Sequence, residues 1–110
     1  MWHPFDEGST LGTDVSEGGF AIRDEEHERG ARISLERDAK AAPFAITCGI
    51  YGWMVHTTFL SDVAEAQEAF DQMKRDLERI LEMIPIHNDP AADEKIQLVQ
   101  SAISAFVGKH

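Results

Sequence analysis

The chain has 110 residues, 43% of them hydrophobic and 27% charged, and its formal net charge is −10. A chain of this length can bury one hydrophobic core without disulfides or a structural metal, so we expect one domain. Its apolar runs are far shorter than the ~20 residues of a membrane span. Its acidity disfavours nucleic acid and anionic membrane surfaces, which bind clusters of Lys and Arg. The single cysteine, Cys48, and the lack of a secretory signal pattern predict a cytoplasmic protein.

Residues 1–18 mix Gly, Ser, Thr and acids and show no sustained hydrophobic period. We therefore predict an irregular N-terminal arm over residues 1–18, with one short strand around Thr10–Val15, and a single α+β domain over residues 19–110. Trp2 and Phe5 are too apolar for a fully solvated tail, so we expect at least one of them to dock on the domain.

From residue 20 onward, apolar and polar residues alternate with a period of two, which is typical of half-buried strands. A loop at residues 26–29 that closes on Gly30 predicts a hairpin between residues 20–25 and 31–36. In that hairpin the pairs on the apolar face are Phe20 with Leu35, Ile22 with Ile33, and Asp24 with Ala31.

A second hairpin is predicted from residues 44–50 and 53–60, joined by a two-residue turn at Tyr51-Gly52. This turn pairs Ile50 with Trp53, Cys48 with Val55, Ile46 with Thr57, and Phe44 with Phe59 on an apolar face. The opposite face, which we call the back face of the sheet, then receives Met54, His56, Thr58 and Leu60 from the last strand.

Two amphipathic helices follow. The first begins after the N-cap Asp62 and carries an apolar stripe to Ile84, before Pro85 stops it. Its acids are interpreted as a solvated face: Glu65, Glu68, Asp71, Glu78 and Glu82. The second helix is predicted to begin at Asp89-Pro90 and to end at Gly108. The predicted fold is thus α+β: a four-stranded antiparallel β-meander with two C-terminal antiparallel helices packed on one face.

Catalytic and metal motifs are weak in this sequence. Cys48 and His56 could pair as nucleophile and base, but the predicted register places them on opposite faces, and a buried free cysteine usually behaves as a small hydrophobe. The histidines fall on separate elements without metal-ligand spacing: His3, His27, His56, His87 and His110. No glycine cluster has the context of a phosphate loop. We therefore expect no catalytic residue, no metal and no cofactor.

The back face of the second hairpin is the surface on which function is expected. Its candidate ligand or interface residues are Arg32, Tyr51, Met54, His56, Thr58 and Leu60. Several of these side chains are large for contact with water, and small residues lie between them. Such a surface suits docking of the N-terminal arm, a second copy of the chain, or a small ligand, and an ordinary exposed sheet face remains an alternative.

Two functional hypotheses follow. The first is a non-catalytic interaction module that binds a protein partner or self-associates as a homodimer, either through the back face or through the edge of strand 53–60. An acidic inhibitor or immunity-type protein with a basic partner belongs to this class, favoured by the charge alone. The alternative is a small-molecule-binding or enzymatic domain that uses the back face around His56.

Overall fold

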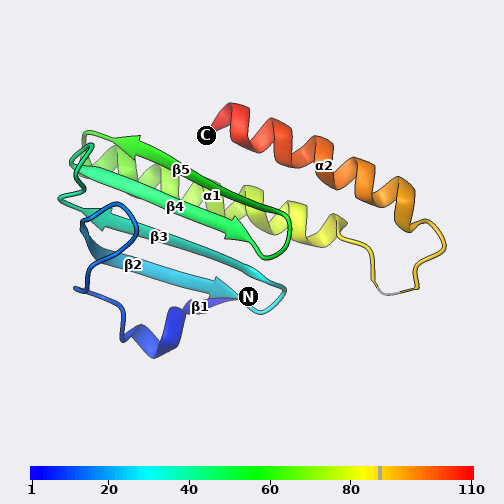
Figure 1. Ribbon diagram of the computed structural model, residues 1–110, viewed down its shortest axis with the longest axis horizontal. Coiled ribbons are helices and arrows are strands. Elements are labelled where there is room, and N and C mark those ends of the chain that lie inside the picture. Colours follow the sequence, from blue (N-terminus) through cyan, green and yellow to red (C-terminus); the bar gives the residue numbers. More distant parts are fainter. Residues whose placement is uncertain (87) are drawn as a thin grey trace.

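The computed structural model describes residues 1–86 and 88–110. Its five strands form one antiparallel sheet in the order β1-β2-β3-β4-β5, followed by two helices (Figure 1). The strands are β1 (Trp2–Pro4), β2 (Phe20–His27), β3 (Ala31–Arg37), β4 (Phe44–Ile50) and β5 (Met54–Leu60). The predicted α+β meander with two C-terminal helices is confirmed, but the sheet has five strands instead of four. The additional strand, β1, is only three residues long, too short to show a period of two.

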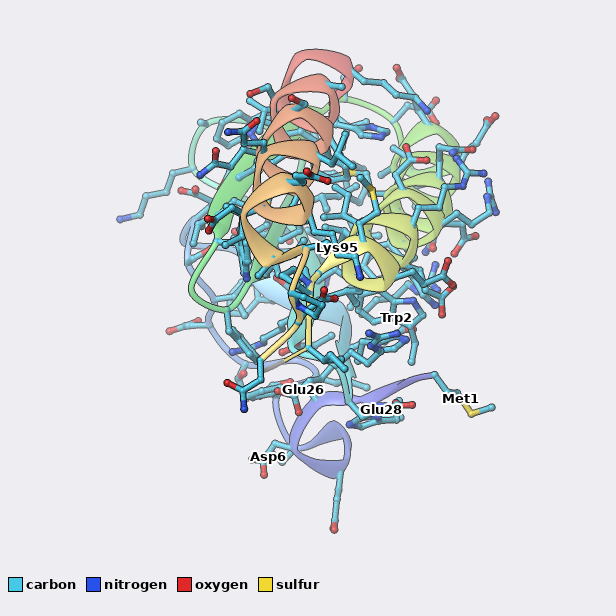
Figure 2. The ribbon with its side chains drawn as sticks, turned by 90° about the vertical axis from the view of Figure 1, so that its right-hand side faces the viewer. Met1, Trp2, Asp6, Glu26, Glu28 and Lys95 are labelled. Carbon is cyan, nitrogen blue, oxygen red and sulfur yellow. The ribbon has the colours of Figure 1, made fainter. Side chains whose placement is uncertain are left out.

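The N-terminal arm returns toward the sheet. After β1 it forms the 3₁₀ turn η1 (Phe5–Gly8), and the strand predicted around Thr10–Val15 is reduced to one isolated bridge between Asp14 and Phe20. Figure 2 shows η1, marked by Asp6, and the second helix, marked by Lys95, at opposite sides of the molecule. Trp2 packs against the hydrophobic core, which confirms that at least one aromatic residue of the arm docks.

The predicted register of the first hairpin is wrong. β2 continues to His27, and the turn contains only Glu28, Arg29 and Gly30, where Gly30 has a φ of +106°. The shorter turn shifts the pairing by an odd number of positions and so reverses the face of residues 23–27, whereas the bulge between Ala21 and Arg23 returns Phe20 and Ala21 to their predicted faces. The observed pairs include His27 with Ala31, Glu25 with Ile33, and Arg23 with Leu35, whereas Asp24 pairs with Ser34.

The second hairpin also differs by one residue. Its turn contains Tyr51, Gly52 and Trp53 instead of two residues, and Gly52 has a φ of +82°. The observed pairs are Ile50 with Met54, Cys48 with His56, Ile46 with Thr58, and Phe44 with Leu60. A slip of one residue exchanges the two faces of a strand. The odd-numbered residues Val55, Thr57 and Phe59 therefore lie on the back face, and the even-numbered ones face the helices.

The helices are α1 (Val63–Met83) and α2 (Ala92–Lys109), which run antiparallel (Figure 1). The predicted N-cap is confirmed, since Asp62 Oδ1 accepts hydrogen bonds from the backbone N–H of Ala64 at 2.7 Å and of Glu65 at 3.1 Å. α2 begins later than predicted, at Ala92, because Asp89 instead holds a turn through the N–H of Ala91 at 2.8 Å. His87, in the predicted interhelix loop, lies outside the described residues.

One hydrophobic core fills the space between the sheet and the helices. β3 and β4 contribute every second residue to it, and the apolar stripe of α1 covers them. Its largest fully buried apolar side chains are Phe70, Ile33, Leu35, Ile46, Ile50, Met73, Leu77, Leu81 and Val99. Burial of this face is what fixes the sheet register, because each strand has only one parity that reaches the core.

Candidate functional site

The six candidate residues do not form one site. Arg32 and Tyr51 lie on the back-face side of the sheet, as predicted. The other four candidates, Met54, His56, Thr58 and Leu60, face the helices, so the prediction that they lie on the back face is wrong. Met54 and Leu60 pack at the border of the core. The cause is the additional turn residue in the β4–β5 hairpin, which shifts β5 by one position.

His56 and Thr58 instead meet α2. The His56 ring stands edge-on to Phe106, with ring centroids 6.2 Å apart, and its Nε2 is buried without a hydrogen-bond partner among the described residues. Thr58 Oγ1 donates a hydrogen bond to the carbonyl oxygen of His110 at 2.6 Å. Both residues therefore join β5 to the C-terminal part of α2 on the helix side of the sheet.

Cys48 and His56 are cross-strand neighbours on the same face, so the argument that the sheet separates them is wrong. Their environment nevertheless opposes nucleophilic chemistry. Burial raises the pKa of the Cys48 thiol from 9.0 to about 12, which leaves almost no thiolate near neutral pH. A thiol needs a lowered pKa or an adjacent base with an open path to substrate in order to act as a nucleophile. Cys48 therefore behaves as a small core residue.

An ion pair on the back face ties the arm to the sheet. Arg32 donates two hydrogen bonds to the fully buried carboxylate of Asp24, Nε to Oδ1 at 2.9 Å and Nη2 to Oδ2 at 2.6 Å. Thr10 of the arm donates to the same carboxylate at 2.8 Å, and the Phe5 ring lies 3.5 Å from the Arg32 guanidinium carbon. The hydrogen bonds to Asp24 raise the pKa of Arg32 further.

A second buried carboxylate anchors the end of the arm. Glu36 is fully buried and accepts hydrogen bonds from the backbone N–H of Gly19 at 3.1 Å and of Glu17 at 3.4 Å. Farther along, Ser16 Oγ lies 3.1 Å from Thr47 Oγ1, which lies 3.3 Å from Thr57 Oγ1. The arm therefore covers the back face over β2 and β3 and reaches the near side of β4.

A cavity of about 750 Å³ remains between the arm and the β4–β5 turn. Ser34, Thr47 and Gly49 form its floor on the back face. The arm residues Thr10 and Thr13–Ser16 form one wall, and the segment Tyr51–Val55 forms the other. Its surface is mostly apolar, with hydroxyl groups at intervals. Cavities of this size accommodate small molecules.

Tyr51 limits the cavity at one end. Its hydroxyl donates a hydrogen bond to Glu26 Oε2 at 2.6 Å. Desolvation, followed by this hydrogen bond and the charge of Glu26, raises the pKa of Tyr51 from 10.0 to about 12. The phenol is therefore neutral at physiological pH and acts as a hydrogen-bond donor.

β5 forms the edge of the sheet opposite to the arm. No strand pairs with its outer edge in the described sheet. Val55 is 80% exposed and Phe59 is 49% exposed on this strand. The seven residues Met54–Leu60 contain no Lys, Arg, Asp, Glu or Pro. β5 thus lacks the charges, prolines and short length that usually prevent edge strands from pairing.

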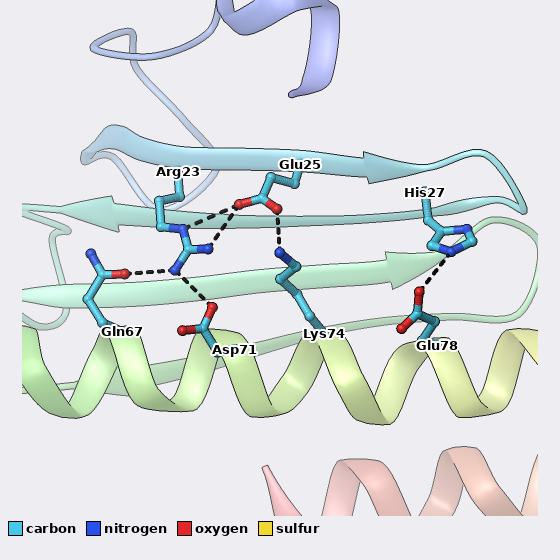
Figure 3. A network of polar contacts seen from close by, with 7 residues as sticks. All are labelled: Arg23, Glu25, His27, Gln67, Asp71, Lys74 and Glu78. Carbon is cyan, nitrogen blue, oxygen red and sulfur yellow. Dashed lines mark hydrogen bonds and ion pairs between the residues drawn. The ribbon is translucent and has the colours of Figure 1, made fainter. Parts of the chain in front are cut away.

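The interface of β2 with α1 is polar, and sequence analysis missed it (Figure 3). Arg23 Nη1 lies 3.1 Å from Asp71 Oδ1, while Glu25 accepts from Arg23 at 3.1 Å and from Lys74 at 2.5 Å. His27 Nε2 lies 3.2 Å from Glu78 Oε1. Asp71 and Glu78 are 51% and 42% exposed, as expected for a solvated face, but each also contacts a basic side chain of β2.

A signal for this interface was present in the sequence. On α1 a polar stripe recurs at spacings of four, three and four beside the apolar stripe: Gln67, Asp71, Lys74 and Glu78. On β2 the residues of one parity are Arg23, Glu25 and His27. Two polar rows of matching length indicate that the strand and helix face each other. In contrast, no local signal marks the cavity wall, because it depends on how the arm returns.

Comparison of the chain with protein-family models, with curated proteins and with solved structures finds no match. Within the described residues, neither α1 nor α2 is both long enough and apolar enough to cross a membrane.

Proposed function

We propose that this protein is a non-catalytic interaction module that self-associates through β5, the outermost strand of its sheet. The observation that carries the proposal is an uncharged seven-residue edge strand with Val55 and Phe59 exposed. An exposed, long and apolar edge offers unpaired backbone groups to another strand. A second copy of β5 would satisfy these groups and cover both side chains.

The sequence of β5 is self-complementary in one antiparallel register. A two-fold axis at Thr57 places Val55 of one copy opposite Phe59 of the other, twice, with Thr57 opposite Thr57. All of these residues lie on the back face, because they share one parity. Pairs between aromatic and β-branched residues across antiparallel strands are favourable. The resulting dimer would have one continuous ten-stranded sheet.

Neighbouring residues of β4 leave the side chains of Val55 and Phe59 free for a partner. On the back face, the positions of β4 next to Val55 and Phe59 are Gly49 and Ala45. Neither of these residues carries a charge or a long side chain. The apolar residues of β5 are therefore not used by their own sheet and are available to a partner strand.

A charge exchange tests both the interface and its register. In a dimer of the double variant Val55→Lys, Phe59→Lys, lysine lies opposite lysine at both pairs, so we expect a monomer. Val55→Lys with Phe59→Glu places lysine opposite glutamate at both pairs, so we expect the dimer to be retained. Sedimentation equilibrium across a range of concentrations measures the mass of each variant.

Leu98→Lys is the matched control, since Leu98 is 59% exposed on α2, away from the edge. It should dimerise like the parent chain. The proposal fails if the parent chain is monomeric at all concentrations. Equal behaviour of the two double variants would reject the register at Thr57.

Salt separates self-association from binding of a basic partner. Two copies with a formal charge of −10 each repel one another, so screening by added NaCl should strengthen the dimer. An inhibitor-type complex with a basic partner would instead weaken as salt is added. The measurement is the dimer dissociation constant between low and physiological ionic strength. An increase in that constant with salt would contradict association through an uncharged edge.

A further inference from the structure

We infer that the cavity between the arm and the β4–β5 hairpin binds a neutral, mostly apolar small molecule that donates one hydrogen bond to Ser34. This site shares Val55 with the proposed β5 interface but does not require a second copy of the chain. It differs from the predicted ligand site around His56, which lies on the opposite face of the sheet. Its volume of about 750 Å³ falls within the range of small-molecule sites.

Ser34 supplies the polar anchor. Its residue is only 8% exposed, it lies on the back face opposite Asp24 and Thr47, and it lines the cavity. Its hydroxyl makes no hydrogen bond with any described residue, whereas the hydroxyls of Thr10, Ser16 and Thr47 all have partners. Because the Ser34 hydroxyl borders the cavity and makes no such bond, it can accept a hydrogen bond from a ligand at that position.

Gly49 lines the floor beside Ser34 without a side chain. It lies on the same face, on the neighbouring strand. A Cβ built at Gly49 would stand 3.1 Å from the carbonyl oxygen of Met54 and 3.6 Å from Val55 Cγ2. A side chain at Gly49 would therefore be crowded by β5, so this part of the floor is bare backbone, against which a flat molecule can lie. Tyr51 and Trp53 line the adjacent wall and offer aromatic surface to such a molecule.

The charges around the cavity select against anions. Arg32, the one cation in its lining, is neutralised by the buried Asp24. Asp14 on the arm wall and Glu26, which accepts from Tyr51, add two negative charges. An anionic ligand would therefore face a net negative surround without a free cation in the lining to pair with. A neutral ligand avoids this cost.

The probe pair N-phenyl-1-naphthylamine and 1-anilinonaphthalene-8-sulfonate tests these features. Both are anilinonaphthalenes with one N–H donor, and only the second carries a negative charge. We expect the neutral dye to bind the full chain with one site and a rise in fluorescence, and the sulfonate to bind at least about tenfold more weakly. Shifts of backbone amide resonances should map to Ser34, Thr47 and Gly49.

Variants assign the anchor. Ser34→Ala should weaken binding of the neutral dye about three- to tenfold, the loss of one ordinary hydrogen bond. Ser101→Ala, at an exposed serine of α2, should leave it unchanged. Val15→Trp fills the cavity from the arm side and should abolish binding without altering the core.

Four results would overturn the inference. The neutral dye could fail to bind, the sulfonate could bind as tightly as the neutral dye, or the amide shifts could map to the cleft near Pro85 and Leu98. Unchanged binding in both Ser34→Ala and Val15→Trp would also overturn it. Because Val15 belongs to the arm and not to the core, this second variant keeps the test valid if Ser34→Ala destabilises the sheet.

Discussion

Different interactions hold the helices against the two lateral halves of the sheet. At β2, a row of charged side chains from the strand meets a charged row from α1, with Arg23, Glu25 and Lys74 at its centre. At β4 and β5 the contacts with the helices are apolar and aromatic, with Cys48 buried and Phe106 against His56. Ion pairs depend on partners being present at fixed positions, whereas apolar packing depends mainly on area removed from water.

The two edge strands of the sheet also differ from one another. β1 is three residues long and ends in Pro4, both of which discourage pairing with another strand. β5 is seven residues long and uncharged. The half of the sheet with the charged β2–α1 interface therefore ends at the short strand β1 of the arm. The half formed by β4 and β5 ends at an edge to which another strand can add. This asymmetry is the reason why the proposed assembly uses β5.

The largest expected effect is on the apolar side. Phe106 is only 3% exposed and contacts the rings of both His56 and His110. Phe106→Ala should lower the free energy of unfolding by ~3–5 kcal/mol, because it removes a buried ring and leaves a cavity. Urea unfolding followed by tryptophan fluorescence measures the change. Phe59→Ala, at a half-exposed phenylalanine of β5, is the matched control and should cost less than about 1 kcal/mol in the monomer. Equal losses would mean that β5 is assigned to the wrong face.

A smaller effect is expected on the polar side. The Glu25 side chain is mostly buried and accepts hydrogen bonds from both Arg23 and Lys74. Glu25→Gln keeps the shape but removes the charge that both cations face, so the free energy of unfolding should fall by ~1–3 kcal/mol. The same urea titration measures it. Glu65→Gln, at an exposed position in the first turn of α1, should change stability by less than half as much. If the two variants were alike, the network of Figure 3 would contribute nothing specific to the fold.

The smallest expected effect concerns Cys48 at alkaline pH. Its pKa is about 12 in the folded chain against 9.0 normally, so the folded state favours the protonated thiol. As pH rises above 9 the unfolded chain loses the proton first, and the free energy of unfolding falls until about pH 12. The parent chain should therefore lose stability faster than Cys48→Ala between pH 9 and 10.5, measured by urea unfolding. Parallel pH profiles would show that the thiol is not desolvated. Tyr51 titrates in both chains and cancels from the comparison.

Local sequence determined the helices of this protein. The structure confirms both predicted ends of α1, the N-cap at Asp62 and the end before Pro85. Each of these signals acts on backbone groups only a few residues away in the sequence, as does the apolar stripe of α1. The α+β class followed in the same way, from a change of hydrophobic period along the chain. Such features depend on neighbours in sequence, so a single chain is enough to predict them.

Only the tertiary structure decided which face of β5 is buried. The even-numbered residues Met54, His56, Thr58 and Leu60 and the odd-numbered set Trp53, Val55, Thr57 and Phe59 are about equally apolar. Either set could face a core, and one turn residue exchanges them. Packing settles the choice, because Phe106 and His110 of α2 contact His56 and Thr58. The cavity likewise depends on distant contacts, those of the arm with Asp24, Glu36 and Thr47. Sequence periodicity reports how apolar each face of a strand is, but when both faces are similar only the partners across the fold determine which one is buried.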